Sequence, residues 1–145
     1  MDKKYKPLVD KLYFIIFIPT SALVVAPNLL AIFAPTALLL TIPIALFTLY
    51  FLISPLFGYV VLRDEGLLIR YGFFLTKEIP YSKIRSVRLE RKWYTETMLS
   101  LKSSFDHILI RYNSFDTTAV SVKDNDELIG EILGKNSIII HEQAK

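Results

Sequence analysis

Few residues in this 145-residue chain have the type and spacing that catalysis or metal binding requires. The absence of cysteine excludes thiolate metal sites, cysteine nucleophiles and disulfides. The two histidines, His107 and His141, show no H-x-x-x-H spacing that would make them a pair of metal ligands. We expect His107, which begins an apolar strand, to be a partly exposed strand-end residue; a pH-sensing or ligand-binding role is the alternative.

One acidic cluster has a composition that suits a metal ion, but a helix start explains it better. Acidic side chains in the first turn of a helix interact favourably with the helix dipole. No G-x-S-x-G, phosphate-binding loop or dinucleotide-binding motif occurs either. The sequence therefore predicts a protein without enzymatic activity, cofactor, bound metal or evident small-molecule substrate. The acidic residues of this cluster, which we expect at the start of a helix, are Asp124, Asp126, Glu127 and Glu131.

The marked electrostatic feature is a basic segment at 77–92, where six Lys or Arg residues accompany two Glu. Beside anionic headgroups each such residue contributes on the order of 1 kcal/mol. The alternative is a solvated strand face, because strand alternation places Arg85 and Arg91 on one side and Arg88 on the other. The candidate membrane-surface or partner contacts are Tyr81, Lys83, Arg85, Arg88, Arg91, Lys92 and Trp93.

A long uncharged segment precedes these residues, because no Asp, Glu, Lys or Arg occurs in the 51 residues from Leu12 to Leu62. A helix rises about 1.5 Å per residue, so crossing about 30 Å of hydrocarbon takes about 20 residues. Two crossings fit this length, with a turn between Ala26 and Thr36, and we expect transmembrane helices at about 12–31 and 36–57. A cleavable signal peptide fits poorly, because its apolar region is about 7–15 residues long.

Prolines recur at intervals of eight residues in this segment. Kinked helices that shape a cavity or partner groove are one interpretation, but membrane helices also tolerate proline without a special role. We favour the second, because no ionisable residue lies in either expected span, and such residues usually mark a transport path or proton relay. A transporter or channel is therefore not expected. The prolines are Pro19, Pro27, Pro35 and Pro43.

The positions of the basic residues predict the orientation in the membrane. Lys and Arg are retained on the cytoplasmic side, and the turn between the two expected spans carries no charge. A hairpin returns both ends to one side, so we expect the N-terminus and the region after Leu62 to be cytoplasmic. The basic residues of the N-terminal flank are Lys3, Lys4, Lys6 and Lys11.

From Arg63 onward, short β-branched or aromatic runs alternate with turn signals, which is typical of strands. One helix follows, with Asp124 as its N-cap, Glu127 completing a capping box and Gly134 as a left-handed stop. Six or seven short strands and a terminal helix predict a small sandwich or barrel that the helix closes at one end. The expected strands are 59–63, 67–71, 74–79, 84–90, 108–112 and 117–122.

Several stretches resemble a known family when they are taken in this order. They are 58–61, 65–72, 79–84, 98–101, 106–112 and 120–133. Together with the two-span hairpin they resemble the bacterial pleckstrin-homology (PH)-like domain of small membrane-anchored proteins. Residues 102–105 look like an insertion relative to that family, and His107 replaces its usual basic residue.

The resemblance implies an α+β protein: an N-terminal transmembrane helical hairpin, then a PH-like β-sandwich or barrel with a C-terminal α-helix. We expect a membrane anchor at 1–57, a cytoplasmic PH-like domain at 58–141 and a tail at 142–145. The expected location is the plasma (inner) membrane of a bacterium, with both termini cytoplasmic.

Three functional hypotheses follow. The first is a non-enzymatic module whose domain meets a protein partner, or a second copy, at the lipid bilayer. The second is a lipid-surface sensor that binds anionic headgroups through the region 77–93, and the third is a small enzyme that acts on a lipid. The resemblance does not imply phosphoinositide binding, because the matching turn, 64–66, is Asp-Glu-Gly. Nucleic acid is not expected at a net formal charge of +3.

Overall fold

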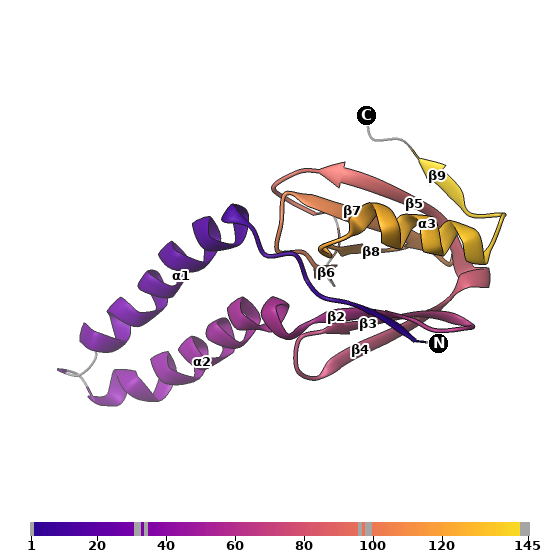
Figure 1. Cartoon of the computed structure of the whole chain (residues 1–145). Helices are drawn as coiled ribbons and strands as arrows, with labels where there is room; N and C mark the ends of the chain where they lie inside the picture. The colour runs from indigo at the N-terminus through magenta and orange to yellow at the C-terminus, as the bar shows by residue number, and fades with distance from the viewer. Residues whose placement is uncertain (1, 31–32, 34, 96, 98–99, 143–145) are drawn as a thin grey trace.

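The two apolar segments form a helical hairpin that extends away from the rest of the protein (Figure 1). The structure is a computed structural model that describes residues 2–30, 33, 35–95, 97 and 100–142. Helix α1 spans Lys11–Leu30 and α2 spans Pro35–Phe57. Both are long and apolar enough to cross a membrane, and only 11% and 6% of their apolar windows are buried inside the protein. Core helices of a soluble domain would be mostly buried.

The turn of the hairpin is shorter than the sequence indicates. Helix α1 continues through Pro27 and Asn28, so these residues are not part of the turn. The Asn28 side chain donates to the carbonyl oxygen of Val24 at 2.8 Å, which satisfies part of this polar group within the apolar helix. Positions 31, 32 and 34 of the expected turn, and positions 143–145 of the expected tail, lie outside the described residues.

The first sheet contains four antiparallel strands in the order β1-β2-β3-β4. Strand β1 precedes α1 and was not predicted from the sequence. The buried Tyr5 on β1 pairs with Val60, so the N-terminal segment is part of the domain's sheet. The strand bounds are Lys3–Tyr5 for β1, Tyr59–Leu62 for β2, Gly66–Tyr71 for β3 and Leu75–Pro80 for β4.

The second sheet has the order β6-β8-β7-β5-β9, in which the two outer strands pair in parallel and the inner ones antiparallel. A short 3-10 helix, η2 (Tyr81–Lys83), leads into it. Within the described residues no strand belongs to both sheets, so they form a sandwich and the β-barrel alternative is wrong. The bounds are Ile84–Arg91 for β5, Ser100–Leu101 for β6, Asp106–Tyr112 for β7, Asp116–Val120 for β8 and Ile140–Glu142 for β9.

The C-terminal helix α3 spans Asn125–Lys135 and packs against the second sheet, as expected, but its ends differ from the prediction. Asp124 occupies the N-cap position, as predicted, but its side chain makes no capping hydrogen bond. The carboxylate of Glu127, which the capping box would direct to the start of the helix, accepts a hydrogen bond from Lys3 of β1. The helix also continues past Gly134, whose φ is not positive.

The core lies between the two sheets and under α3. The apolar stripe of α3 is buried there, as its helical spacing predicts. Each fully buried aliphatic side chain contributes about 1.5–3 kcal/mol relative to an exposed one, so this layer holds the sandwich together. The α+β fold class is confirmed. Fully buried examples are Leu67, Ile69 and Ile79 in the first sheet, Ile108 and Ile110 in the second, and Leu128 and Ile132 in α3.

Candidate functional site

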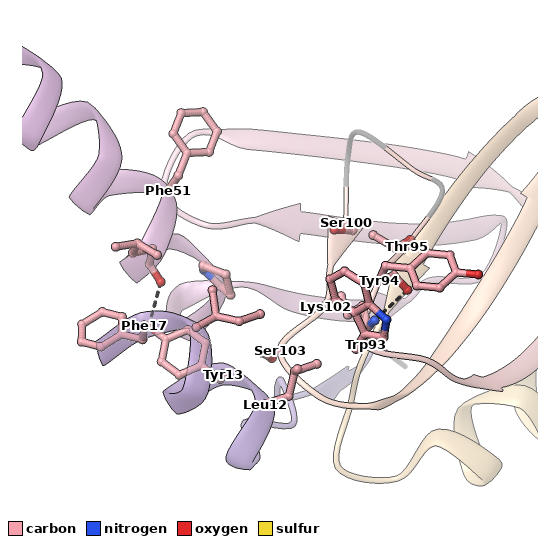
Figure 2. A pocket seen from close by; sticks show the side chains of 13 residues that line it. Leu12, Tyr13, Phe17, Phe51, Trp93, Tyr94, Thr95, Ser100, Lys102 and Ser103 are labelled. Carbon is pink, nitrogen blue, oxygen red and sulfur yellow. Dashed lines mark hydrogen bonds between the residues drawn. The ribbon is translucent and has the colours of Figure 1, made fainter. Parts of the chain in front are cut away.

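An apolar groove lies where the helical hairpin meets the domain, and it encloses about 290 Å³ (Figure 2). One wall consists of the first turns of α1 and the last turns of α2. The other wall is the segment that follows β5, together with β6 and the residues just after it. Its aromatic side chains come from both walls and are Tyr13, Phe17, Phe51, Trp93 and Tyr94.

Asp10 fixes the helical wall to the domain. One carboxylate oxygen accepts the amide of Leu12 at 2.8 Å, which caps α1. The other accepts the hydroxyl of Ser104 at 2.7 Å and the amide of Phe105 at 3.0 Å. Burial raises the pKa of Asp10, but these hydrogen bonds outweigh it and the net pKa lies below the ordinary value. The start of α1 is therefore tied to the loop between β6 and β7.

Tyr13 joins the two helices within the groove. Its hydroxyl donates to the carbonyl oxygen of Leu52 on α2 at 2.7 Å, and its ring stacks on Phe17 at 5.3 Å between centroids. Figure 2 shows Tyr13 and Phe17 on the same wall as Phe51. These contacts preform the helical wall at the end of the hairpin nearest the domain.

Lys102 supports the domain wall. Its ammonium group donates to the carbonyl oxygens of Lys92 and Tyr94, at 2.5 and 2.8 Å. Burial lowers the pKa of Lys102. Beside it, Trp93 is 69% exposed and meets the ring of Tyr94 edge to face at 5.5 Å. The groove thus combines large apolar and aromatic surfaces, which suits a hydrocarbon chain or an apolar side chain.

The basic segment does not form one patch. Lys83 and Arg85 lie at the start of β5, whereas Arg91 and Lys92 lie at its end. A strand rises about 3.3 Å per residue, so the ends of β5 are about 23 Å apart. Only the second pair, with Trp93, lies next to the groove. The expected contact set is therefore divided between two ends of the sandwich.

Acidic residues also compensate part of this positive charge. Glu90 pairs with Arg88, and its other oxygen lies 3.5 Å from the Lys92 ammonium group. Arg91 lies 3.8 Å from Asp106. Partial neutralisation reduces the attraction that these residues exert on an anionic surface.

Tyr81 faces the core. Its side chain is buried and its hydroxyl donates to the carbonyl oxygen of Arg63 at 3.0 Å. Burial raises its pKa to about 12. Tyr81 therefore contributes to the join between the two sheets, and its ring is not presented to a partner.

His107 is fully buried, so the expectation of a partly exposed strand-end residue is wrong. The reason is that β7 lies between β5 and β8, where His107 pairs with Glu90. Nδ1 lies 3.1 Å from the carbonyl oxygen of Phe105, to which it donates, and Nε2 lies 3.6 Å from a Glu90 oxygen. Burial lowers the pKa of His107.

The acidic residues of α3 contact β1. Lys3 pairs with Glu127 and, at 3.0 Å, with Glu131. Asp126 and Glu127 occupy the first turn of the helix, in agreement with a helix-start role. In the part of the chain that the structure describes, no three His, Asp or Glu side chains are grouped as a metal ion would require.

A second hollow, of about 420 Å³, lies at the end of the sandwich that includes the start of β5. We call this the distal end; Figure 1 shows β9, one of its strands, on the side away from the helical hairpin. Phe115 and Ile140, which line it together with Arg85, are strongly exposed, and so is Ile138, two residues before Ile140 along the chain. This apolar surface was not predicted from the sequence, because single exposed residues from separate segments share no common spacing.

The fold is a PH-like domain preceded by two helices that are long and apolar enough to cross a membrane, an arrangement consistent with a membrane-anchored protein. The family model described as "Bacterial PH domain" matches residues 57–136, more than half of the chain. The protein therefore belongs to the bacterial PH domain family. PH domains are generally non-catalytic interaction modules. A comparison with curated protein sequences found no match.

Proposed function

We propose that this protein is a non-enzymatic module that presents its PH-like domain to a protein partner, or to a second copy, at the cytoplasmic face of a bacterial plasma membrane. The two helices act as a transmembrane anchor and leave the domain on one side. The four Lys residues of the N-terminal flank and the uncharged turn support a cytoplasmic domain.

The distal apolar surface is the observation that carries this proposal. Phe115 is 96% exposed, Ile140 is exposed in the same hollow, and Ile138 is exposed two residues before Ile140. Removing apolar surface from water is favourable, and an exposed apolar patch marks a surface at which another molecule binds. This surface lies at the end of β5 opposite the groove, so the bilayer around the helices does not cover it. A protein surface is the occupant that fits.

The proposal is tested by a photo-crosslinking residue placed at Phe115 in the full chain in cells. We expect a discrete protein adduct, because this side chain is almost fully exposed and lines the hollow at the distal end. Lys123 is exposed on the same domain and serves as the control position. The Ile140→Asp substitution should abolish the adduct at position 115. Failure to form an adduct there contradicts the proposal.

Protease accessibility tests the orientation. Protease should digest the domain in inside-out vesicles and leave it intact in spheroplasts, because positive flanks are retained in the cytoplasm. Digestion in spheroplasts would overturn the proposed orientation while leaving the interaction surface to be tested separately.

The lipid-sensing alternative is supported by one half of the basic segment. Arg91, Lys92 and Trp93 lie at the end of β5 next to the helices. Trp93 is the single tryptophan, so its emission reports this region directly. If the protein senses lipid, the emission of Trp93 should shift to the blue in anionic bilayers but not in zwitterionic ones. High salt should reverse this shift, because salt screens exposed charges. Equal emission in both bilayers eliminates this alternative.

A further inference from the structure

The turn between β3 and β4 is apolar and uncharged, and its last residue is exposed. It comprises Gly72, Phe73 and Phe74, and together with Leu75, the first residue of β4, it forms what we call the 72–75 tip. Phe74 is 83% exposed and Leu75 49%. Hairpin turns that face water usually carry polar residues, so this composition indicates a different environment.

The 72–75 tip lies directly against α2. The ring of Phe73 is 4.4 Å from that of Phe57, and the ring of Phe74 stacks on Tyr50 at 5.9 Å. Gly72 has a φ of 75°, and a Cβ atom there would lie 1.6 Å from the Ser54 hydroxyl. Glycine is therefore required for this close approach. Figure 1 shows the β3–β4 turn on the side of the sheet that faces the hairpin.

The contact with Tyr50 indicates how far the tip reaches along the helix. Tyr50 precedes the end of α2 at Phe57 by seven residues, which is about 10 Å along the axis. The 23 residues of α2 are about 34 Å long, only slightly more than the roughly 30 Å hydrocarbon core. If α2 spans the bilayer, the level of Tyr50 lies in or at the edge of the hydrocarbon.

The carbonyl groups of the tip have partners suited to this environment. The Arg70 guanidinium donates to the carbonyl oxygens of Gly72 and Phe73, at 3.1 and 2.6 Å. It also donates to the hydroxyl of Tyr59 at 3.3 Å. Backbone groups without partners are costly in lipid, because no water replaces the lost hydrogen bonds. Arg70 thus satisfies the carbonyl groups of the turn while its charge remains at the base of the turn, next to Tyr59.

We propose that the 72–75 tip is a second membrane anchor, which inserts Phe74 and Leu75 into the lipid interface beside α2. The occupant of this apolar surface is the bilayer that the chain's own helices span, because the exposed rings continue the apolar surface of α2. The inference rests on the transmembrane anchor of the proposed function and does not depend on the partner. The tip would hold the domain in one orientation, with its distal end directed away from the lipid.

Three single-tryptophan variants of the full chain test this proposal. Each carries Trp93→Phe and is reconstituted in bilayers of phosphatidylcholine brominated in the middle of its acyl chains, which quenches tryptophan on contact. Phe47→Trp, within α2, reports the span itself. Phe74→Trp reports the tip, and Phe115→Trp reports a matched exposed phenylalanine at the other hairpin turn.

We expect brominated lipid to quench Phe47→Trp and Phe74→Trp, with a blue-shifted emission for both, and to leave Phe115→Trp unchanged. If Phe47→Trp is quenched but Phe74→Trp resembles Phe115→Trp, the tip proposal is wrong and the anchor stands. A blue shift of Phe74→Trp that depends on protein concentration, without quenching, assigns the tip to a second copy and also overturns it. If Phe47→Trp is not quenched, the transmembrane anchor fails, and the tip proposal fails with it.

Discussion

Two hairpin turns at opposite ends of the domain share a backbone plan but differ in their surroundings. The β3–β4 and β7–β8 turns each contain three residues between paired strands. Each begins with a residue of positive φ, Gly72 at 75° and Asn113 at 52°. Each also exposes one phenylalanine, Phe74 or Phe115, to a large extent.

The difference lies in what each turn contacts. The β3–β4 turn has no polar side chain of its own, and Arg70 from the adjacent strand binds its carbonyl groups. In the β7–β8 turn the Asn113 amide donates to the Asp116 carboxylate at 2.7 Å, so this turn satisfies itself in water. The comparison shows that the same three-residue turn can either pack against an apolar helix or face water, depending on the residues around it.

The largest effect is expected from Gly72→Val, which breaks the contact with α2. A side chain at positive φ costs about 1–2 kcal/mol, and overlap with Ser54 adds about 1–3 kcal/mol. The control Asn113→Gly should change stability by less than about 1 kcal/mol, because glycine adopts this φ without strain. Denaturant unfolding of the purified full chain measures both. Equal effects at the two turns would contradict the close approach of the tip to α2.

A smaller loss is expected from Arg70→Gln, because glutamine does not reach both carbonyl groups of the tip with a forked donor. Removing hydrogen bonds from a charged donor costs about 1–3 kcal/mol. At the other turn, Asp116→Ala should cost less than about 0.5 kcal/mol, since its partner amide is exposed to water. Denaturant unfolding of the full chain compares the stability of the Arg70→Gln and Asp116→Ala variants. An Arg70 effect no larger than that of Asp116 would show that the guanidinium does not support the turn.

The Phe74→Ser substitution tests whether the β3–β4 turn, unlike the β7–β8 turn, inserts into the bilayer. Burying an apolar side chain contributes about 1.5–3 kcal/mol when complete, so partial insertion of Phe74 should contribute about 1 kcal/mol to holding the tip. Amide hydrogen exchange over residues 72–76 should be faster in this variant than in the parent protein when both are in bilayers. Phe115→Ser should leave exchange in this segment unchanged. Unaltered exchange in Phe74→Ser would count against insertion.

The smallest effect concerns pH and should leave both turns unchanged. Burial lowers the pKa of His107, so the unfolded chain binds a proton near pH 6.5 more readily than the folded protein does. Stability should therefore be greatest above that pH and decline as pH falls below it. The neighbouring Glu90 carboxylate favours the protonated ring, which limits the decline.

The pH dependence is measured as the unfolding midpoint of the parent protein and of His107→Gln between about pH 7.5 and 5. The decline attributed to this residue should be absent in the variant. The emission of Phe74→Trp should stay constant over the same range while the domain remains folded. An identical slope in parent and variant would show that other groups control the response.

Local patterns were sufficient to predict most of the regular elements. The charge-free length of 51 residues indicated two helices, and both form. Alternating apolar runs located six strands, β2, β3, β4, β5, β7 and β8. The apolar stripe of α3 is buried as expected. These predictions succeed because helix and strand periodicity, and the length needed to cross a bilayer, are local properties of a chain.

The candidate surfaces depended on contacts between distant residues. Strand β1 forms only because α1 and α2 return the chain so that Tyr5 meets Val60. Tyr81 and His107 are buried by strands and loops that no local pattern identifies. The basic segment does not form one patch, because its residues lie at the two ends of β5, which are about 23 Å apart.

The amino-acid sequence by itself determined that this chain would combine an apolar helical hairpin with a strand-rich, PH-like domain, because charge distribution and periodicity are written along the chain. Only the tertiary structure decided which aromatic residues face the helices and which face away. Phe74 and Phe115 occupy equivalent places in two similar turns. Their environments differ because sheet packing brings one turn to α2 and carries the other to the distal end.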